Sequence, residues 1–240
     1  MKLEICANSF ESACTAQEAG AHRIELCANL EIGGTTPSYA TIALVKQRLH
    51  IPTYVLIRPR AGDFLYSQAE YDCMAKDIEI CRQLGCEGVV IGLLFPDGSV
   101  DKERTTSLVK IAEPMGVTFH RAFDCCQNPL QALEDIIATG CQRILTSGQQ
   151  ASAIAGAAFL QELVEQANDR ISIMPGSGIN SANIEELIRQ TKAKEFHCSA
   201  KKERHSEMTY VNECMQQMGA QPSMSNLEEI KAIVAKIKDV

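Results

Sequence analysis

Two cysteines near the start of the chain, Cys6 and Cys27, each end a short apolar run. If these runs are neighbouring parallel strands, which lie about 4.8 Å apart, two thiols at the same level could share one metal ion. Thiolates select soft ions such as Cu(I) over Mg²⁺ or Ca²⁺, and two sulfurs are too few for a tetrahedral zinc site. Free cysteine is also among the most buried residue types and packs as a small apolar side chain. The spacing alone favours that packing role, and the metal site remains the alternative.

A second set of polar residues could bind an anionic molecule and move protons on it. Arg58 and Arg60 follow another apolar run, and a planar guanidinium suits bidentate contact with phosphate or carboxylate. Glu25, His120 and Asp124 belong to the residue types that act as general acids and bases. The alternative is structural, because Glu25, Arg58 and Arg60 could form an ion-pair network and a histidine at a strand end is often only hydrogen-bonded. We favour a small-molecule site over the structural network.

A glycine-rich segment, Gly176-Ser177-Gly178, is the third feature with chemical meaning. We expect it to open a helix together with Ile179 and Asn180, and the free N–H groups and dipole of a helix start attract anions. Ser199 could add a hydroxyl to the same anion site, because barrels commonly hold phosphate at the loops after their last two strands. A short Gly-Ser-Gly also serves simple turns, so it is a weak signal by itself.

These residues are tied together by a repeating pattern of a short apolar run, a polar loop and an amphipathic stretch, which occurs eight times. The candidate strands are Leu3–Cys6, Arg23–Cys27, Thr53–Ile57, Gly88–Ile91, Val117–His120, Arg143–Thr146, Ile171–Met174 and Glu195–Cys198. We expect the strand interiors to be apolar and the chain to turn polar only at their C-terminal ends. The residues at those ends are Cys6, Asn8, Ser9, Glu25, Cys27, Arg58, Arg60, Asp63, His120, Arg121, Asp124, Thr146, Ser147, Gly176, Ser177, Gly178, His197, Cys198 and Ser199.

Strands that alternate with helices predict a parallel sheet, and eight repeats favour its closure. The predicted fold is α/β: a single (β/α)8 TIM-barrel domain over residues 1–240, with parallel strands and outer helices. Ser67 with Glu70, and Ser225 with Glu228, match the capping box of a helix start. An open doubly wound sheet is the alternative, but no GxGxxG opens the first helix. In a barrel the functional site lies at the C-terminal ends of the strands, where the polar residues gather.

The composition argues against some partners and compartments. The 240 residues include 23 Lys and Arg against 30 Asp and Glu, and this net charge of −7 argues against nucleic acid as a partner. Eleven cysteines, an odd number without a CxxC pair, fit a reducing compartment. The N-terminal MKLEICANS has no long apolar run, so we expect a cytoplasmic protein without a signal peptide or membrane span.

One long segment, residues 200–225, interrupts the repeat after the eighth strand. Loops of this length without their own structure are usually lids, interfaces or disordered segments, and we expect a lid or a subunit contact. Its thioether, thiol and imidazole groups could also bind Cu(I), although methionine often fills flexible contacts. These residues are His205, Met208, Cys214, Met215, Met218 and Met224.

Taken as an ordered set, the motifs of this chain resemble the copper homeostasis protein CutC family. The segments that carry the resemblance are Ile5-Cys6 with Ser9 to Ala13, GAHRIELCANL, IGGTTPS, IRPRAGDFLYS, TFHRAFD, RILTSG, MPGSGI and EFHCSA. The resemblance covers nearly the whole chain and implies a cytoplasmic, often dimeric (β/α)8 barrel with a link to copper tolerance. It also implies a Cu(I) site, because the cysteines proposed to bind copper in the family correspond to Cys6 and Cys27. Ala61 and Ser177 depart from the commoner family residues without removing a candidate ligand.

These observations lead to three functional hypotheses. The first is a cytoplasmic, homodimeric copper homeostasis protein that binds Cu(I) through the Cys6 and Cys27 thiolates at the barrel mouth. The second is an enzyme that acts on a small phosphorylated or carboxylated metabolite, with Arg58 and Arg60 as the anion clamp. The third is a scaffold whose barrel mouth binds another protein. The sequence does not decide whether the protein is an enzyme.

Overall fold

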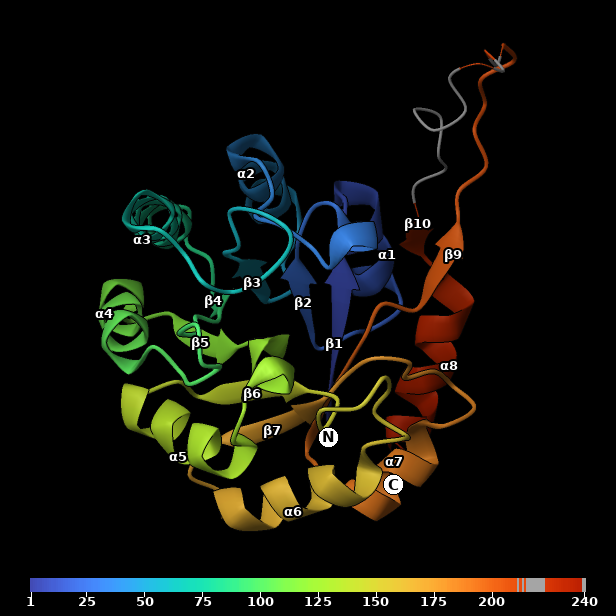
Figure 1. Cartoon of the computed structure of the whole chain (residues 1–240). Coiled ribbons are helices and arrows are strands. Elements are labelled where there is room, and N and C mark those ends of the chain that lie inside the picture. Colours follow the sequence, from blue (N-terminus) through green and yellow to red (C-terminus); the bar gives the residue numbers. More distant parts are fainter. Residues whose placement is uncertain (211, 213, 215–222, 239–240) are drawn as a thin grey trace.

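The computed structural model describes residues 1–210, 212, 214 and 223–238. Eight parallel strands form a nearly closed barrel with the helices around its outside, which confirms the predicted (β/α)8 TIM barrel (Figure 1). The strands are β1 (Lys2–Ala7), β2 (Arg23–Leu26), β3 (Thr53–Leu56), β4 (Gly88–Ile91), β5 (Gly116–Phe119), β6 (Arg143–Thr146), β7 (Ser172–Pro175) and β8 (Glu195–Cys198). Each predicted strand is therefore present, with boundaries that move by one residue or so.

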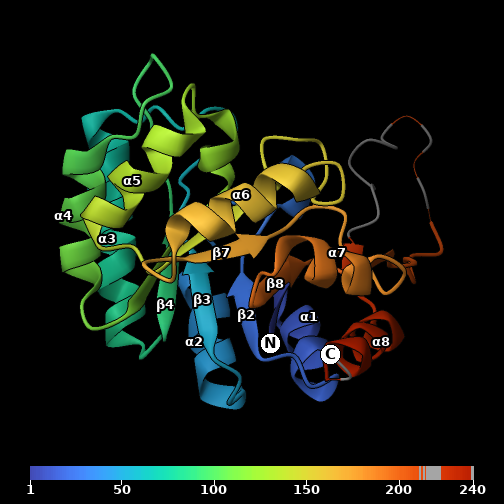
Figure 2. The same ribbon diagram turned by 90° about the horizontal axis from the view of Figure 1, so that it is seen from below.

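The order of strands around the barrel follows the chain. Parallel ladders join β1 to β2 and so on to β7, and β8 closes back onto β1. The remaining neighbours, β7 and β8, lie side by side (Figure 2). The C-terminal ends of all these strands therefore meet at one rim.

The helices cover the outer face of the barrel with apolar stripes. The α-helices are α1 (Phe10–Glu18), α2 (Tyr39–Arg48), α3 (Gln68–Gln83), α4 (Lys102–Ala112), α5 (Pro129–Thr139), α6 (Ala157–Ala167), α7 (Ile184–Thr191) and α8 (Leu227–Lys238), and the 3₁₀ helices are η1 (Leu30–Ile32) and η2 (Arg121–Cys125). The capping box of Ser67 and Glu70 is present at the start of α3. The predicted box at Ser225 is wrong, because Asn226 accepts the first N–H bonds of α8 while Ser225 ends a strand.

The segment after β8 has structure of its own at both ends. β9 (Lys201–Glu203) pairs with β10 (Ser223–Ser225) as an antiparallel ribbon, so the expectation of a structureless loop is wrong for these residues. The described residues after β9 extend away from the barrel, and Met208 and Tyr210 are more than 70% exposed (Figure 1). Met215 and Met218 lie outside the described residues. The role of this segment as a lid or subunit contact stays a prediction.

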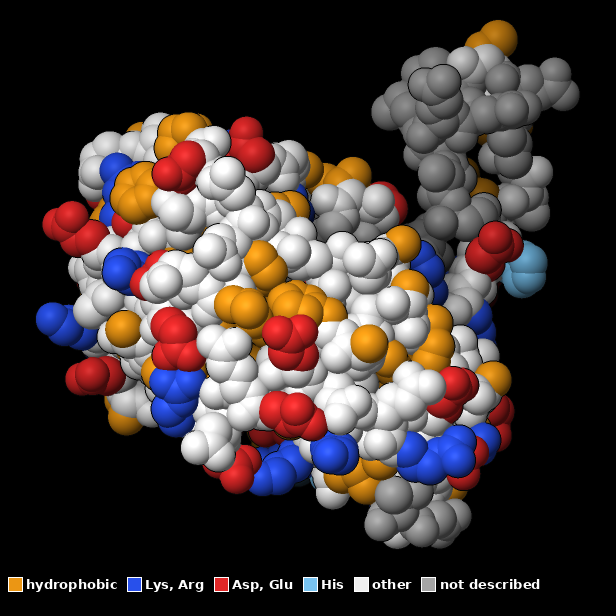
Figure 3. Space-filling model, turned by 60° about the horizontal axis from the view of Figure 1, so that its bottom comes forward, with side chains coloured by type: hydrophobic (Ala, Val, Ile, Leu, Met, Phe, Trp, Pro, Cys, Tyr) orange, Lys and Arg blue, Asp and Glu red, His pale blue; other side chains and the backbone are white. Residues whose placement is uncertain are grey.

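The surface and helix lengths bear on possible partners. Among the helices of residues 1–210 and 223–238, none is long and apolar enough to cross a membrane. On the face drawn in Figure 3, Lys and Arg side chains are interspersed with Asp and Glu side chains.

The barrel interior differs from the prediction of apolar strand cores. Glu4, Arg23, Arg143 and Glu195 all lie inside the barrel, each less than 10% exposed. Successive side chains of a strand point to opposite faces, so residues two apart share the interior. Charged side chains are therefore present in the barrel interior below the rim, and not only at the C-terminal ends of the strands.

Candidate functional site

A cavity of about 620 Å³ lies at the C-terminal ends of the strands. Most of the site residues predicted from the sequence line this cavity. Those that line it are Cys6, Glu25, Cys27, Arg58, His120, Asp124, Ser177, Gly178 and Ser199. Arg60 and Gly176 are not among the lining residues, whereas His197, which had no predicted role, is one of them.

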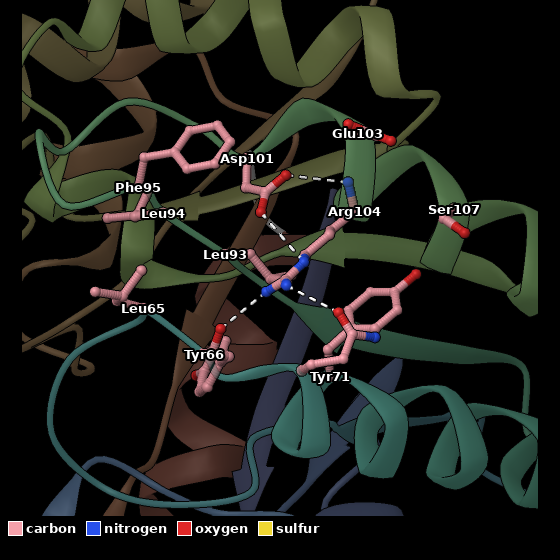
Figure 4. A pocket seen from close by; sticks show the side chains of 11 residues that line it. Leu65, Tyr66, Tyr71, Leu93, Leu94, Phe95, Asp101, Glu103, Arg104 and Ser107 are labelled. Atoms are coloured by element: carbon pink, nitrogen blue, oxygen red, sulfur yellow. Dashed lines mark hydrogen bonds and ion pairs between the residues drawn. The ribbon is translucent and has the colours of Figure 1, made fainter.

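A second cavity, of about 500 Å³, lies between the loops that follow β3 and β4 (Figure 4). The Arg104 guanidinium crosses it and donates to the Tyr66 carbonyl at 2.8 Å and to the Gln68 side chain at 3.0 Å. Asp101 lies 3.8 Å from the same guanidinium. Because the Arg104 guanidinium that crosses it already has partners within the protein, this cavity is a weaker site candidate than the barrel mouth.

The two thiols lie together in the wall of the mouth. The Sγ atoms of Cys6 and Cys27 are 3.6 Å apart. Both side chains are almost fully buried, and Leu56 and Val90 pack against them in a small apolar cluster. The hydrogen bond to Cys27, together with burial and the nearby Glu25, raises the pKa of the Cys6 thiol. The Cys6 thiol therefore favours its protonated form unless a cation replaces the proton.

Below the thiols, a histidine lies between two buried carboxyl groups. His197 Nδ1 is 2.8 Å from Glu4 Oε1, and Nε2 is 3.7 Å from Glu25 Oε2. Burial opposes a positive charge on His197, but the hydrogen bond to Glu4 and the charges of Glu25 and Glu4 outweigh it and raise the pKa of the imidazole. Burial raises the pKa of Glu25. This part of the mouth can therefore hold a proton between adjacent groups.

A balanced layer of charges supports this histidine from beneath. Arg23 donates to Glu4 and, at 2.7 Å, to Glu195, which also accepts from Arg143 at 2.7 Å. The ring of Tyr54 lies beside both guanidinium groups, 4.8 Å from that of Arg23 and 5.3 Å from that of Arg143. Two cations and two anions are thus buried together, and their mutual attraction offsets part of the cost of taking each of them out of water.

This layer predicts a loss of stability in acid. Burial disfavours ionisation of Glu4, but the charges of Arg23, His197 and Arg143 outweigh it and lower the pKa to about 2, from an ordinary 4.5. A group with a depressed pKa in the folded state stabilises the protein above its unfolded pKa. We expect roughly 3 kcal/mol of stability from Glu4 at neutral pH, lost as the pH falls from about 4.5 to about 2.

Urea unfolding of the wild type and of Glu4→Gln at pH 7, 4.5 and 3 measures this loss. The wild type should lose stability more steeply with falling pH than the variant. Parallel pH profiles of the two proteins would contradict the assignment to Glu4.

The two arginines of the predicted anion clamp lie in different places. Arg58 lines the cavity but donates to the carbonyl groups of Ile32, Gly34 and Gly62, at 3.2, 2.7 and 2.8 Å. Arg60 lies beyond the strand end and forms ion pairs of 2.9 Å with Asp63 and 2.6 Å with Glu70. Both terminal nitrogens of Arg58 are thus already bonded, only its buried Nε has no partner among the described residues, and the two guanidinium groups do not form one clamp.

His120 is buried at the end of β5 and is held in one orientation. Its Nδ1 accepts the Ala122 N–H at 3.1 Å, and its Nε2 has no hydrogen-bond partner among the described residues. Burial and the positive charge of Arg58 lower the pKa of His120 to about 3. The imidazole is thus neutral at physiological pH, with its proton on Nε2, and it can donate a hydrogen bond there but is a weak base.

Asp124 organises the loops of the rim. Its carboxylate accepts from Arg121 at 2.7 Å, from the Ser147 N–H and hydroxyl at 3.1 and 3.0 Å, and from the Gln149 N–H at 3.1 Å. Thr146 donates to the same carboxylate. These contacts occupy both carboxylate oxygens and fix the turn after β6.

The Gly-Ser-Gly segment forms a turn and does not open a helix as predicted. Ser177 and Gly178 have left-handed backbone angles, with φ of 79° and 73°, and α7 begins only at Ile184. In the intervening turn the Ser181 N–H and hydroxyl donate to the Glu229 carboxylate at 2.6 and 3.0 Å. These two donors of the turn are thus taken by a carboxylate of the same chain. A glycine is needed at position 176, because a Cβ there would lie 2.5 Å from the Leu145 side chain.

The fold and the mouth residues define a (β/α)8-barrel protein with a partly polar, thiol-containing cavity at the C-terminal ends of its strands. The chain belongs to the CutC family, whose family model matches residues 1–202. This confirms the family resemblance of the sequence motifs.

Relatives and solved structures agree with this assignment. A CutC family protein of Chromobacterium violaceum is 55% identical over 208 residues, which cover 87% of this chain and 84% of the relative. A CutC family protein of Xanthomonas campestris pv. campestris is 46% identical over 234 residues, 98% of each chain. The crystal structure of the putative copper homeostasis protein CutC from Streptococcus agalactiae has a TM-score of 0.79 and 33% identity, covering 83% of this chain and 98% of that one. An N-(5'-phosphoribosyl)anthranilate isomerase from Pyrococcus furiosus, at 13% identity over the full length of both chains and a TM-score of 0.59, shares the fold alone.

Proposed function

We propose that this protein takes part in copper homeostasis by binding Cu(I) between the thiolates of Cys6 and Cys27. The observation that carries the proposal is the 3.6 Å separation of the two Sγ atoms. Metal–sulfur distances are about 2.3 Å, so two sulfurs at this separation can both reach one ion. The similar protein from Streptococcus agalactiae is named for copper homeostasis, which supports the same function.

The surroundings of the thiols also suit a soft monovalent cation. Leu56 and Val90 exclude water around the pair, and soft thiolate ligands favour Cu(I) over hard cations in such a place. All eleven cysteines are free thiols, which supports a reducing compartment and hence a cytoplasmic location. We further propose a homodimer on the basis of the family resemblance, and light scattering of the purified protein tests it.

An anaerobic Cu(I) titration against a competing chelator tests the copper site. We expect about one Cu(I) per reduced chain, and we expect the double variant Cys6→Ser, Cys27→Ser to lose this binding because hydroxyl groups are poor ligands for a soft ion. Cys198→Ser is the matched control, since Cys198 is also a buried thiol at a strand end but does not line the cavity. Unchanged Cu(I) affinity in the double variant would rule the site out.

A second candidate function is an enzyme that acts on a small phosphorylated or carboxylated metabolite. The size of the cavity favours it, because 620 Å³ exceeds what a metal ion needs and matches small-molecule sites. Glu25, His120 and Ser199 offer polar contacts at its wall. A thermal-shift screen of phosphorylated and carboxylated metabolites tests it, because a ligand of the native state raises the melting temperature. The absence of any stabilising compound would count against this function.

A further inference from the structure

Cys6 takes part in a second cluster of ligand atoms, deeper than the thiol pair. One ligand atom each of Cys6, Glu25 and His197 can be chosen so that all three lie within 4.8 Å of one another. The three residues are only 5%, 5% and 8% exposed, and all of them line the mouth cavity. Cys27 contacts Cys6 but does not belong to this cluster. The mouth therefore offers two different ligand sets that share a single sulfur.

The ligand types of the deeper cluster differ from those of the thiol pair. A thiolate, an imidazole and a carboxylate are the three ligand types that Zn²⁺ takes in proteins. The thiolate and the carboxylate together carry two negative charges, which a divalent ion neutralises and a monovalent ion does not. Since an uncompensated buried charge is costly, the cluster favours a divalent ion over Cu(I).

His197 is held in the orientation that metal binding needs. The Glu4 carboxyl group is fully buried, pairs with Arg23, and lies with Oε1 2.8 Å from His197 Nδ1. This leaves Nε2 on the side of Glu25, 3.7 Å from its carboxylate oxygen. A carboxylate that accepts from the far nitrogen of a histidine ligand fixes its tautomer and strengthens it as a ligand.

We propose that Cys6, Glu25 and His197 form a binding site for one divalent transition-metal ion of the Zn²⁺ type. Three protein ligands leave one position of a tetrahedron, and all three residues line the mouth cavity. Zinc sites with an open fourth position are the ones that bind water or a substrate. The site goes beyond the proposed copper function and competes with it for one ligand, Cys6.

Metal titrations on four full-length proteins test the site: wild type, Cys27→Ser, His197→Gln and Glu25→Gln. Zn²⁺ affinity is measured by competition with a chromophoric chelator, and Co²⁺ serves as a probe because thiolate-to-cobalt charge transfer reports a bound sulfur. We expect one Zn²⁺ per chain in the wild type and in Cys27→Ser. We expect His197→Gln to weaken Zn²⁺ by more than the 10- to 100-fold that is typical of losing an outer-shell partner, and Glu25→Gln to weaken it as well.

The same proteins separate this site from the copper site. Cu(I) binding should fall in Cys27→Ser and persist in His197→Gln, the reverse of the Zn²⁺ result. Absent Cu(I) binding with intact Zn²⁺ binding defeats the copper proposal alone. Wild-type Zn²⁺ binding that is absent, or that is unchanged in both His197→Gln and Glu25→Gln, overturns the divalent site. Circular dichroism checks the fold of each variant, and Glu25→Gln, which keeps the side-chain size, tests the site if His197→Gln does not fold.

Discussion

Replacing Arg23 by methionine is expected to destabilise the barrel by about 3–5 kcal/mol, the cost of breaking a buried ion pair by removing one partner. Arg23 is 6% exposed and donates to Glu4 and Glu195, both of which lie inside the barrel. Among the described residues, Arg143 is then the only arginine left in contact with this pair of carboxylates, and it donates to Glu195 but not to Glu4. Methionine fills the volume of the arginine stem, so the loss comes from charge and not from a cavity.

Urea unfolding of wild type and Arg23→Met measures this effect. Arg170→Met is the matched control, because Arg170 forms a similar Arg–Glu pair with Glu134, at 2.6 Å, on the exposed surface. Surface ion pairs contribute little, so the control should unfold like the wild type. The stability difference between Arg23→Met and the wild type should also shrink in mild acid, because the Glu4 carboxylate that lacks Arg23 takes up a proton there. Equal stabilities of Arg23→Met and Arg170→Met would show that the buried layer is not needed as an ion-pair network.

The sequence predicted the barrel and the neighbouring positions of Cys6 and Cys27, but not the distance between their sulfur atoms. The eight apolar runs predicted the barrel because each run and each following helix is a local pattern. The neighbouring positions of Cys6 and Cys27 followed from chain order alone, since consecutive strands pair in this fold. The 3.6 Å separation of their sulfur atoms did not, because it depends on the register of β1 against β2 and on side-chain orientation.

The buried charges were missed although the sequence contains a signal for them. Glu4 lies two residues before Cys6, Arg23 two before Glu25, and Glu195 two before His197. In a strand, residues two apart face the same side, so each interior ligand implies another interior residue below it. Applying this two-residue period to the predicted site residues at the strand ends would have placed these charges inside the barrel and indicated His197 as a further site residue.

The predicted anion clamp of Arg58 and Arg60 is not formed, for a different reason. The two residues have the same spacing, but β3 ends at Leu56, and beyond a strand end the alternation of faces no longer holds. Arg58 turns inward to bind loop carbonyls, whereas Arg60 pairs with Glu70 of the α3 capping box. Loop conformation, which depends on tertiary contacts, decides such positions.

The second large effect is expected at Gly88, where replacement by alanine should destabilise the protein by about 1–3 kcal/mol or more through overpacking. A Cβ at this position would lie 2.2 Å from the Tyr54 ring. The ring cannot easily move, because a Cβ at Gly116 would also lie 2.2 Å from its hydroxyl and the guanidinium groups of Arg23 and Arg143 lie beside it. The glycines at the starts of β4 and β5 thus make the space in which this tyrosine crosses the barrel.

A double-mutant cycle with Tyr54→Leu separates overpacking from a general weakness of alanine at this strand position. If the clash is the cause, Gly88→Ala costs much less in the Tyr54→Leu background than in the wild type, and the two changes are strongly non-additive. Additive losses would place the cause in the β4 backbone. Tyr54 also packs against the cluster that contains Cys6 and Cys27, so strain that Gly88→Ala places on the ring should also disturb the packing around the two thiols. The buried charges and the Tyr54 ring thereby connect the stability of the barrel interior to the geometry of the sulfur pair above it.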